Sequence, residues 1–221
     1  GNSGHDSLWD FGVDIDGNVF SVGYYKGTYD FDPGPASYPI TTVNGSYDIY
    51  IQKLDTDGNF AWAKTIGGTS AETARVMTLD TDGNVYVSGT FTGTLDFDPG
   101  AGVENLIGTY YSTWYILKLD SNGDFVWVQN SSAKVEDMCT DPLSNIFITG
   151  YIEGAPDLDP GPGTAIYTSM GNKDILVMKL NSLGEFSWAK TFGDASVDSG
   201  EAIRLDAEGN ILARNLRGAA L

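Results

Sequence analysis

Three pairs of aspartates have the residue type and spacing that could bind a metal ion. They lie in an Asp-x-Asp-Pro-Gly segment that occurs at 30–34, at 96–100 and, with leucine between the aspartates, at 157–161. In an extended chain residues i and i+2 point the same way, so each pair places two carboxylates on one side. The candidate metal ligands are Asp30, Asp32, Asp96, Asp98, Asp157 and Asp159.

A structural turn is the favoured interpretation of these pairs, and calcium binding is the alternative. Two carboxylates supply at most four oxygens, whereas Ca²⁺ takes about six to eight, so carbonyls or water would have to complete a site. Pro-Gly suits the two central positions of a type II turn, and Phe31, Phe97 and Leu158 would anchor the opposite side. A pair of catalytic carboxylates, as in glycosidases, is disfavoured because these pairs recur in each repeat.

A second aspartate motif, Asp-x-Asp-Gly-Asn, occurs at 14–18, 55–59 and 80–84. Alternating aspartates before a glycine also open an EF-hand loop, but that loop needs a bidentate glutamate at its twelfth position, and none follows here. Asp, Asn and Gly are equally the residues of a tight hairpin turn. The third repeat has Asp-Pro-Leu-Ser-Asn at 141–145 instead. The motif therefore indicates a turn, with metal binding as the less favoured alternative.

The composition excludes several classes of function. The chain has 12 Lys and Arg against 30 Asp and Glu, a formal net charge of −18. Such a surface repels phosphate backbones, which argues against nucleic-acid binding, and no apolar run approaches the roughly 18 residues of a membrane span. The single cysteine, Cys139, and the single histidine, His5, leave zinc sites and Ser–His–Asp triads almost without components.

Tandem duplication organises the whole chain. The Asp-x-Asp-Pro-Gly segment returns after 66 and then 61 residues, and Trp62, Trp127 and Trp188 recur at steps of 65 and 61. Each tryptophan follows an aromatic residue by two positions, so the two side chains share one face of a strand. The tryptophans are interpreted as packing between repeats, with a sugar-stacking platform as the less favoured alternative.

Each repeat is expected to form four strands. In the second repeat these are 75–80, 85–91, 114–119 and 124–128, which are rich in Val, Ile, Tyr, Phe and Trp and separated by turns containing glycine. A four-stranded antiparallel unit repeated at this period predicts an all-β fold, a β-propeller of about 3.5 blades. The expected blades are 7–66, 72–131, 134–193 and the start of a fourth at 199–221.

The repeats resemble a known family. Residues 76–89 and 51–68 are similar to the SBBP repeats, the β-propeller repeats of bacterial secreted proteins, and the likeness runs from about residue 7 to 209. The Asp-x-Asp-Pro-Gly insert resembles a subgroup found in Bacteroidetes-type secreted proteins. The resemblance implies secretion or a place on the cell surface. It also implies that the connections between second and third strands and those between successive repeats share one face of the propeller disc, with the tight turns on the other face.

The expected function is a non-catalytic binding or scaffolding module with a protein or glycan ligand. Loops on a rigid scaffold are where binding usually resides. The connection between the second and third strands of the first repeat is rich in tyrosine, which makes it the expected contact surface. The candidate ligand-binding residues are Tyr24, Tyr25, Tyr29 and Tyr38.

Three alternatives stay open. The first is a propeller hydrolase or lyase acting on polysaccharide, which would need a unique cluster of polar residues near one blade. The second is a calcium-stabilised structural spacer in an adhesin. The third is a half-ring that dimerises: closed propellers typically have four to eight blades, so about 3.5 blades need the rest of a longer chain or a second copy to close.

Overall fold

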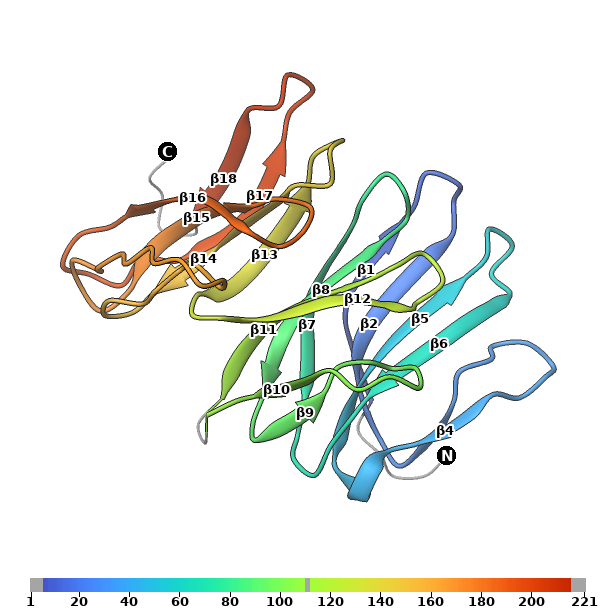
Figure 1. Cartoon of the computed structure of the whole chain (residues 1–221). Helices are drawn as coiled ribbons and strands as arrows, with labels where there is room; N and C mark the ends of the chain where they lie inside the picture. Colours follow the sequence, from blue (N-terminus) through green and yellow to red (C-terminus); the bar gives the residue numbers. More distant parts are fainter. Residues whose placement is uncertain (1–5, 110–111, 216–221) are drawn as a thin grey trace. The chain divides into compact units, whose positions relative to one another are not determined.

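The structure, a computed structural model, describes residues 6–109 and 112–215. The chain divides into two compact units, 1–128 and 129–221, and each is described by itself. The described residues form β-strands joined by turns, with a single three-residue 3-10 helix, η1 (Val43–Gly45) (Figure 1). The expected all-β class is therefore confirmed.

Two four-stranded antiparallel sheets make up the first unit, and each follows the order of the chain. The first sheet consists of β1 (Ser7–Val13), β2 (Val19–Lys26), β5 (Tyr47–Leu54) and β6 (Phe60–Ile66). The second sheet consists of β7 (Thr73–Leu79), β8 (Val85–Phe91), β11 (Thr113–Leu119) and β12 (Phe125–Ser131), whose last residues belong to the second unit.

The second unit holds one more four-stranded sheet and a pair of strands. The third sheet consists of β13 (Lys134–Thr140), β14 (Ile146–Ile152), β15 (Asp174–Leu180) and β16 (Phe186–Phe192). The pair consists of β17 (Gly200–Leu205) and β18 (Ile211–Asn215). Strand β13 packs beside β17, so the first strands of successive repeats are neighbours in this unit, as β1 and β7 are in the first.

Short hairpins, which the sequence did not indicate, fill the connection between the second and third strand of two sheets. In the first sheet the hairpin is β3 (Thr28–Asp30) with β4 (Pro39–Thr41), and in the second it is β9 (Thr94–Asp96) with β10 (Asn105–Ile107). In the third sheet a single bridge between Asp157 and Ile166 stands at the same place. In both hairpins the Asp-x-Asp-Pro-Gly segment starts at the last residue of the first strand and leads into the loop.

The core of the first unit lies between its two sheets. Alternate side chains of a strand point to opposite faces, so one face of the first sheet can pack against one face of the second. This core contains, among others, Phe20, Val22, Ile49 and Ile51 of the first sheet and Val85, Val87, Tyr115 and Leu117 of the second, all fully buried. Each such side chain contributes about 1.5–3 kcal/mol when it is removed from water.

A β-bulge in the first strand of each sheet brings its backbone close to the second strand. The register in the second sheet shifts between Ala74 and Val76, and Gly89 lies beside this point. A Cβ atom on Gly89 would lie 1.9 Å from the carbonyl oxygen of Thr73, so no other residue fits. The glycines at the equivalent positions are Gly23 and Gly150, with corresponding distances of 1.9 and 1.8 Å.

Candidate functional site

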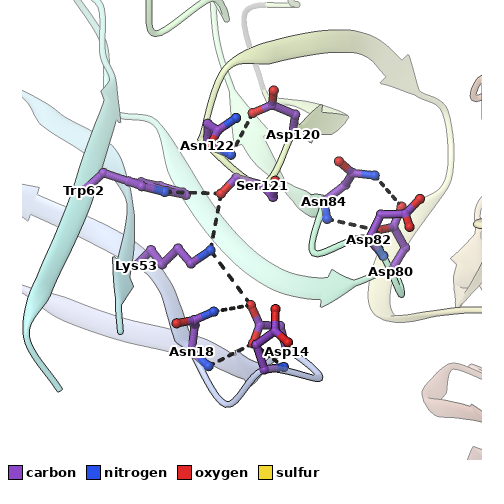
Figure 2. A network of polar contacts seen from close by, with 11 residues as sticks. Asp14, Asn18, Lys53, Trp62, Asp80, Asp82, Asn84, Asp120, Ser121 and Asn122 are labelled. Carbon is purple, nitrogen blue, oxygen red and sulfur yellow. Dashed lines mark hydrogen bonds and ion pairs between the residues drawn. The ribbon is translucent and has the colours of Figure 1, made fainter. Parts of the chain in front are cut away.

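The carboxylates of the Asp-x-Asp-Gly-Asn motifs hold hairpin turns together (Figure 2). In the first turn the Oδ1 atom of Asp14 accepts hydrogen bonds from the backbone N–H of Asp16 at 3.0 Å and of Asn18 at 2.8 Å, and the Asn18 amide donates to Oδ2 at 2.8 Å. Asp80 makes the same three bonds with Asp82 and Asn84, at 3.0, 2.9 and 2.8 Å. The first aspartate is thus the acceptor that closes each turn.

The third repeat keeps the turn although it lacks the second aspartate and the glycine. Asp141 accepts from the N–H groups of Leu143 and Asn145, each at 2.9 Å, and from the Asn145 amide at 2.8 Å. Ser144 takes the left-handed conformation, with φ of 59°, that glycine has in the other repeats. The first aspartate and the last asparagine therefore define the turn.

These hydrogen bonds stabilise the charged form of the turn aspartates. Burial raises the pKa of Asp14 and Asp141. Hydrogen bonds from Asn18 and Asn145, together with nearby lysines, outweigh that effect and hold both pKa values below their usual range. The carboxylates are consequently ionised at neutral pH.

A lysine of the third strand faces each of these turns and lies over an aromatic ring of the second strand. Lys53, Lys118 and Lys179 approach the turn carboxylates of Asp14, Asp80 and Asp141 at 3.9, 3.8 and 3.5 Å. The ammonium groups lie 4.8, 4.9 and 4.8 Å from the ring centroids of Phe20, Tyr86 and Phe147. The same unit of lysine, carboxylate and ring thus recurs in all three sheets.

The repeated tryptophans extend this unit. Trp62, Trp127 and Trp188 meet the rings of Phe20, Tyr86 and Phe147 at centroid distances of 6.0, 6.2 and 6.4 Å. In the first unit the Nε1–H of Trp62 donates to the carbonyl of Ser121 at 3.4 Å, and Lys53 donates to the same oxygen at 3.5 Å (Figure 2). Trp62 therefore joins the first sheet to the second, as the packing interpretation predicts.

Loss of a turn carboxylate is expected to destabilise the fold most where it is buried. We expect Asp80→Ala to lower the free energy of unfolding by about 3 kcal/mol, because its side chain is fully buried and Tyr86 also donates to it at 3.0 Å. The matched control is Asp55→Ala, whose turn has the same bonds but is exposed. Urea denaturation of the two variants measures the difference, and equal losses would contradict the buried role of Asp80.

The Asp-x-Asp-Pro-Gly aspartates also accept backbone hydrogen bonds. In the second repeat, Oδ1 of Asp96 accepts from Asp98 at 3.1 Å and from Glu104 at 2.8 Å, and Oδ1 of Asp98 accepts from Gly100 at 2.7 Å. The other two segments have the same set, with Asp30, Asp32, Gly34 and Tyr38, and with Asp157, Asp159, Gly161 and Ala165. These contacts support the structural turn, and calcium binding at the pairs stays a prediction.

The residue between the aspartates is a hydrophobic anchor, as expected: Phe31, Phe97 and Leu158 are buried. The predicted type II turn at Pro-Gly is wrong. That turn needs a positive φ at glycine, and the glycine of each segment lies outside that region. The hydrogen bond from its N–H to the preceding aspartate side chain closes an Asx-type turn instead.

The four candidate tyrosines do not form one patch. Tyr25 is buried in a small core with Phe31, whereas Tyr29 and Tyr38 are 41% and 45% exposed. Tyr38 packs on Phe60 at a centroid distance of 4.8 Å. Tyr24 is placed elsewhere, between the rings of Trp9 and Tyr47.

Two of these tyrosines do meet at a hollow of about 200 Å³ in the first unit. Its lining consists of Asp6, Ser7, Leu8, Tyr25, Tyr29, Tyr50 and Gln52. The sequence prediction missed Tyr50 and Gln52. A usable signal was present, because the other repeats have Leu117 and Met178 at the position of Gln52, two residues before the last leucine of the strand.

Buried carboxyl groups near the end of the first sheet were also missed. Asp48 is 2% exposed and accepts from the N–H of Val43 at 2.7 Å, and Glu72 is 1% exposed and accepts from Gly68 at 3.2 Å. Burial raises the pKa of Asp48 to about 6. Burial and the nearby charge of Asp48 raise that of Glu72 to about 7. Both side chains are buried, and Oδ1 of Asp48 has no hydrogen-bond partner among the described residues.

The remaining reactive side chains contribute no site. Cys139 lies in β13 beside the small core of the second unit, and burial raises the pKa of its thiol to about 11. His5 lies outside the described residues. Within 6–109 and 112–215, no three His, Cys, Asp or Glu side chains are grouped so as to hold a metal ion. In the same ranges no helix has the length and apolarity to cross a membrane.

Comparison with known proteins finds a distant relative of the chain. No protein-family model matches the chain. The chain is 26% identical to an uncharacterized WD repeat-containing protein of Acanthamoeba polyphaga mimivirus, over 82% of this chain. The alignment covers 15% of the viral protein, so the chain spans only a small part of that relative's length.

Proposed function

We propose that the chain is part of a β-propeller that serves as a non-catalytic binding or scaffolding module. The observation that carries the proposal is the repeated sheet with its unit of lysine, carboxylate, ring and tryptophan, as seen at Lys53 and Trp62. Face-to-face packing of successive four-stranded sheets is the arrangement of propeller blades. Similarity to a WD repeat-containing protein favours the same architecture.

A binding assay tests the function directly. The chain is labelled and applied to glycan and protein arrays, and the same preparation is screened for release of reducing sugar from polysaccharides. We expect saturable binding to at least one ligand class and no release of sugar. Release of sugar at a rate proportional to protein concentration would support the polysaccharide-active enzyme instead.

The chemistry of the described carboxyl groups favours binding over catalysis. A general acid needs a carboxyl with a raised pKa that can reach a substrate. Asp48 and Glu72 have raised pKa values, but they are 2% and 1% exposed and enclosed by loops. The aspartates of the turns are occupied by backbone N–H groups.

The dimerising half-ring alternative has its own test. Two copies of about 3.5 blades would total seven, which falls in the usual range for closed propellers. Sedimentation of the 221-residue chain as a pure monomer at all concentrations would exclude this arrangement. A structural spacer in an adhesin, unlike a binding module, would have no saturable ligand. The absence of saturable binding on the glycan and protein arrays would therefore favour the spacer.

Calcium dependence is tested by thermal melting with calcium and with a chelator. Because the first aspartate of each Asp-x-Asp-Pro-Gly segment already accepts two backbone N–H groups, we expect millimolar calcium to leave the melting temperature unchanged. A ligand that binds only the native state raises stability by RT ln(1 + [L]/Kd). A rise abolished by Asp96→Asn with Asp98→Asn would instead establish the calcium site.

The resemblance to SBBP repeats carries a further part of the proposal, namely a secreted or cell-surface bacterial protein. The net charge of −18 of the chain suits a domain that stays soluble outside the cell. Recovery of the full-length product in the culture medium or on intact cells would support this location, and its retention in the cytoplasm would contradict it.

A further inference from the structure

A row of aromatic and basic side chains crosses the first unit at the ends of the strands that lie away from the tight turns. Its members come from the beginnings of β1, β5, β7 and β11 and from the end of β2. Each side chain contacts the next through a ring or a cation. The residues of this aromatic row, in order of contact, are Lys26, Tyr47, Tyr24, Trp9, Arg75 and Trp114.

Arg75 contacts two tryptophan rings and is exposed. Its guanidinium carbon lies 5.3 Å from the ring centroid of Trp9 and 5.8 Å from that of Trp114. Trp9 in turn contacts the ring of Tyr24 at a centroid distance of 6.3 Å. A guanidinium that lies over aromatic rings is held in one orientation and still presents N–H groups at its edge. The row therefore holds a cation ready to bind an anionic group.

Both cations of the row lack an ion-pair partner within the first unit. Lys26 lies 5.2 Å from the ring centroid of Tyr47, and among the described residues of this unit no carboxylate pairs with Lys26 or Arg75. The third sheet differs at the corresponding positions. There Lys173 lies over a tyrosine ring but is neutralised by Glu153 at 3.6 Å. The first unit thus keeps two unpaired cations in a chain with a net charge of −18.

The row does not belong to the packing that recurs in every repeat. Trp9 and Arg75 are the extra residues at the β-bulges of β1 and β7, and the bulges of β13 and β17 have Glu136 and Glu201 instead. Three residue types of different charge therefore suit the same backbone position. Because the fold does not require tryptophan or arginine there, their meeting in one place indicates a role other than packing.

A blade packed on the outer face of the first sheet would leave the row uncovered. Such a blade would meet Phe11 and Val13, which are 64% and 57% exposed and alternate with Gly12 on the inner side of β1. Tyr24 lies two residues from Val22, which belongs to the core between the two sheets, so its ring projects from the inner face. The row thus begins on the inner face and crosses the strand ends.

The residue types of the row fit a protein partner that carries a carboxylate. Tryptophan, tyrosine and arginine dominate the binding energy of protein interfaces. A guanidinium pairs with a carboxylate through two parallel hydrogen bonds, which are stronger than those between neutral groups. The net negative charge of the chain repels a polyanion, but charges more than roughly 8 Å apart are largely screened at physiological ionic strength. A short segment with few carboxylates is therefore favoured over a polyanion.

We propose that the aromatic row binds a protein segment whose carboxylate pairs with Arg75 and whose neighbouring apolar side chains pack on Trp9 and Tyr24. This inference rests on the proposed binding function and names its class of partner. The row stands on strands whose backbones are fixed by sheet hydrogen bonds, so binding orders few groups of this chain.

The experiment measures the binding of three fluorescein-labelled peptide pools to the full chain by fluorescence anisotropy. Each pool has one fixed central residue, which is glutamate, glutamine or lysine, between positions randomised among phenylalanine, leucine, tyrosine and glycine. We expect the glutamate pool to bind at least ~10-fold more tightly than the glutamine pool, as a charge-assisted hydrogen bond requires. Equal binding of these two pools, or tightest binding of the lysine pool, would overturn the proposal.

Arg75→Gln is expected to abolish the preference for glutamate over glutamine. The side chain is exposed, so the fold should tolerate the change. The matched control is Arg214→Gln in β18, which removes the same charge from an exposed arginine outside the row and should keep the preference. A preference that survives Arg75→Gln, or that is lost equally in the control, would show that Arg75 does not hold the carboxylate.

The indole N–H signals of the five tryptophans show where the glutamate pool binds. Trp9→Phe and Trp114→Phe assign the two signals of the row in a nitrogen-15 NMR spectrum. We expect these two signals to move on addition of the pool and those of Trp62, Trp127 and Trp188 to stay in place. Movement confined to the latter three would place the binding elsewhere and contradict the proposal.

The glycan and protein arrays separate failure of the row from failure of the proposed function. Array ligands that bind the wild type and Arg75→Gln equally would retain the binding module and exclude the row. Absence of any ligand on the arrays and in the pools would exclude both. A glycan that binds the wild type and is lost in Arg75→Gln would assign the row to a sugar and contradict a protein partner.

Discussion

Gly89→Ala is expected to unfold the first unit, lowering the free energy of unfolding by more than about 4 kcal/mol. A Cβ atom would lie 1.9 Å from the carbonyl oxygen of Thr73 and 2.8 Å from its carbonyl carbon. Both atoms belong to the backbone at the β-bulge of β7, so neither can move without breaking the pairing with β8. Losses of this size arise only from a few mechanisms, of which backbone strain is one. Urea denaturation followed by circular dichroism gives the value.

The matched control is Gly12→Ala in β1. A Cβ atom there would contact Leu79 at 3.4 Å and Met77 at 3.6 Å, which is ordinary packing. Because glycine in a strand costs about 0.5–1 kcal/mol relative to alanine, we expect this variant to be unchanged or slightly more stable. A Gly89→Ala chain as stable as the Gly12→Ala chain would mean that the bulge does not approach β8 as closely as the structure has it.

Stability is expected to fall as the pH rises from about 4 to 8. The folded-state pKa values of Asp48 and Glu72 are about 6 and 7, above their ordinary values, because burial disfavours the charged forms. Their stabilising effect is fully present below the unfolded pKa values near 4 and is lost as the pH passes 6 and 7. At 1.36 kcal/mol per unit, the total loss is on the order of 6 kcal/mol. Denaturation in urea at pH 5, 6, 7 and 8 measures it.

The double variant Asp48→Asn with Glu72→Gln should remove this pH dependence. Both amides keep an oxygen that can accept from Val43 and Gly68, and neither ionises. Compared with the parent chain, the variant is expected to gain stability at pH 8 and change little at pH 5. The control is Glu208→Gln, an exposed turn residue, which should leave the slope as it is. A slope that persists in the double variant would assign the dependence to other groups.

The repeat and its strands follow from the sequence because they depend on local patterns. The range 85–91 expected for the second strand coincides with β8, and the other three expected strands of that repeat lie within a few residues of β7, β11 and β12. Apolar alternation and Asp-Gly turns are properties of a few neighbouring residues. The hairpins β3–β4 and β9–β10 were not anticipated, because three-residue strands leave no periodicity to detect.

The candidate site was predictable only in part. The sequence placed Tyr29 in the connection between the second and third strands, where it is exposed. The burial of Tyr25 was not predicted, because it depends on packing against Phe31. Gln52 could have been found by aligning repeats at the end of each strand. The hydrogen bond from the N–H of Val43 to Asp48 could not, because it depends on how the connection before the third strand folds back; in the third sheet Met170 donates to Asp174 in the same way.

The Asp-x-Asp-Pro-Gly segment has a consequence for how such proteins diversify. In all three copies the first aspartate reaches the N–H eight residues later, at 2.7, 2.8 and 2.8 Å. The side chain of the first aspartate thus closes the segment into a loop, and the buried apolar residue between the two aspartates anchors that loop on the sheet. The residues at the tip of the segment can therefore differ between repeats, as 35–37, 101–103 and 162–164 do, while the sheet that carries the segment keeps its register.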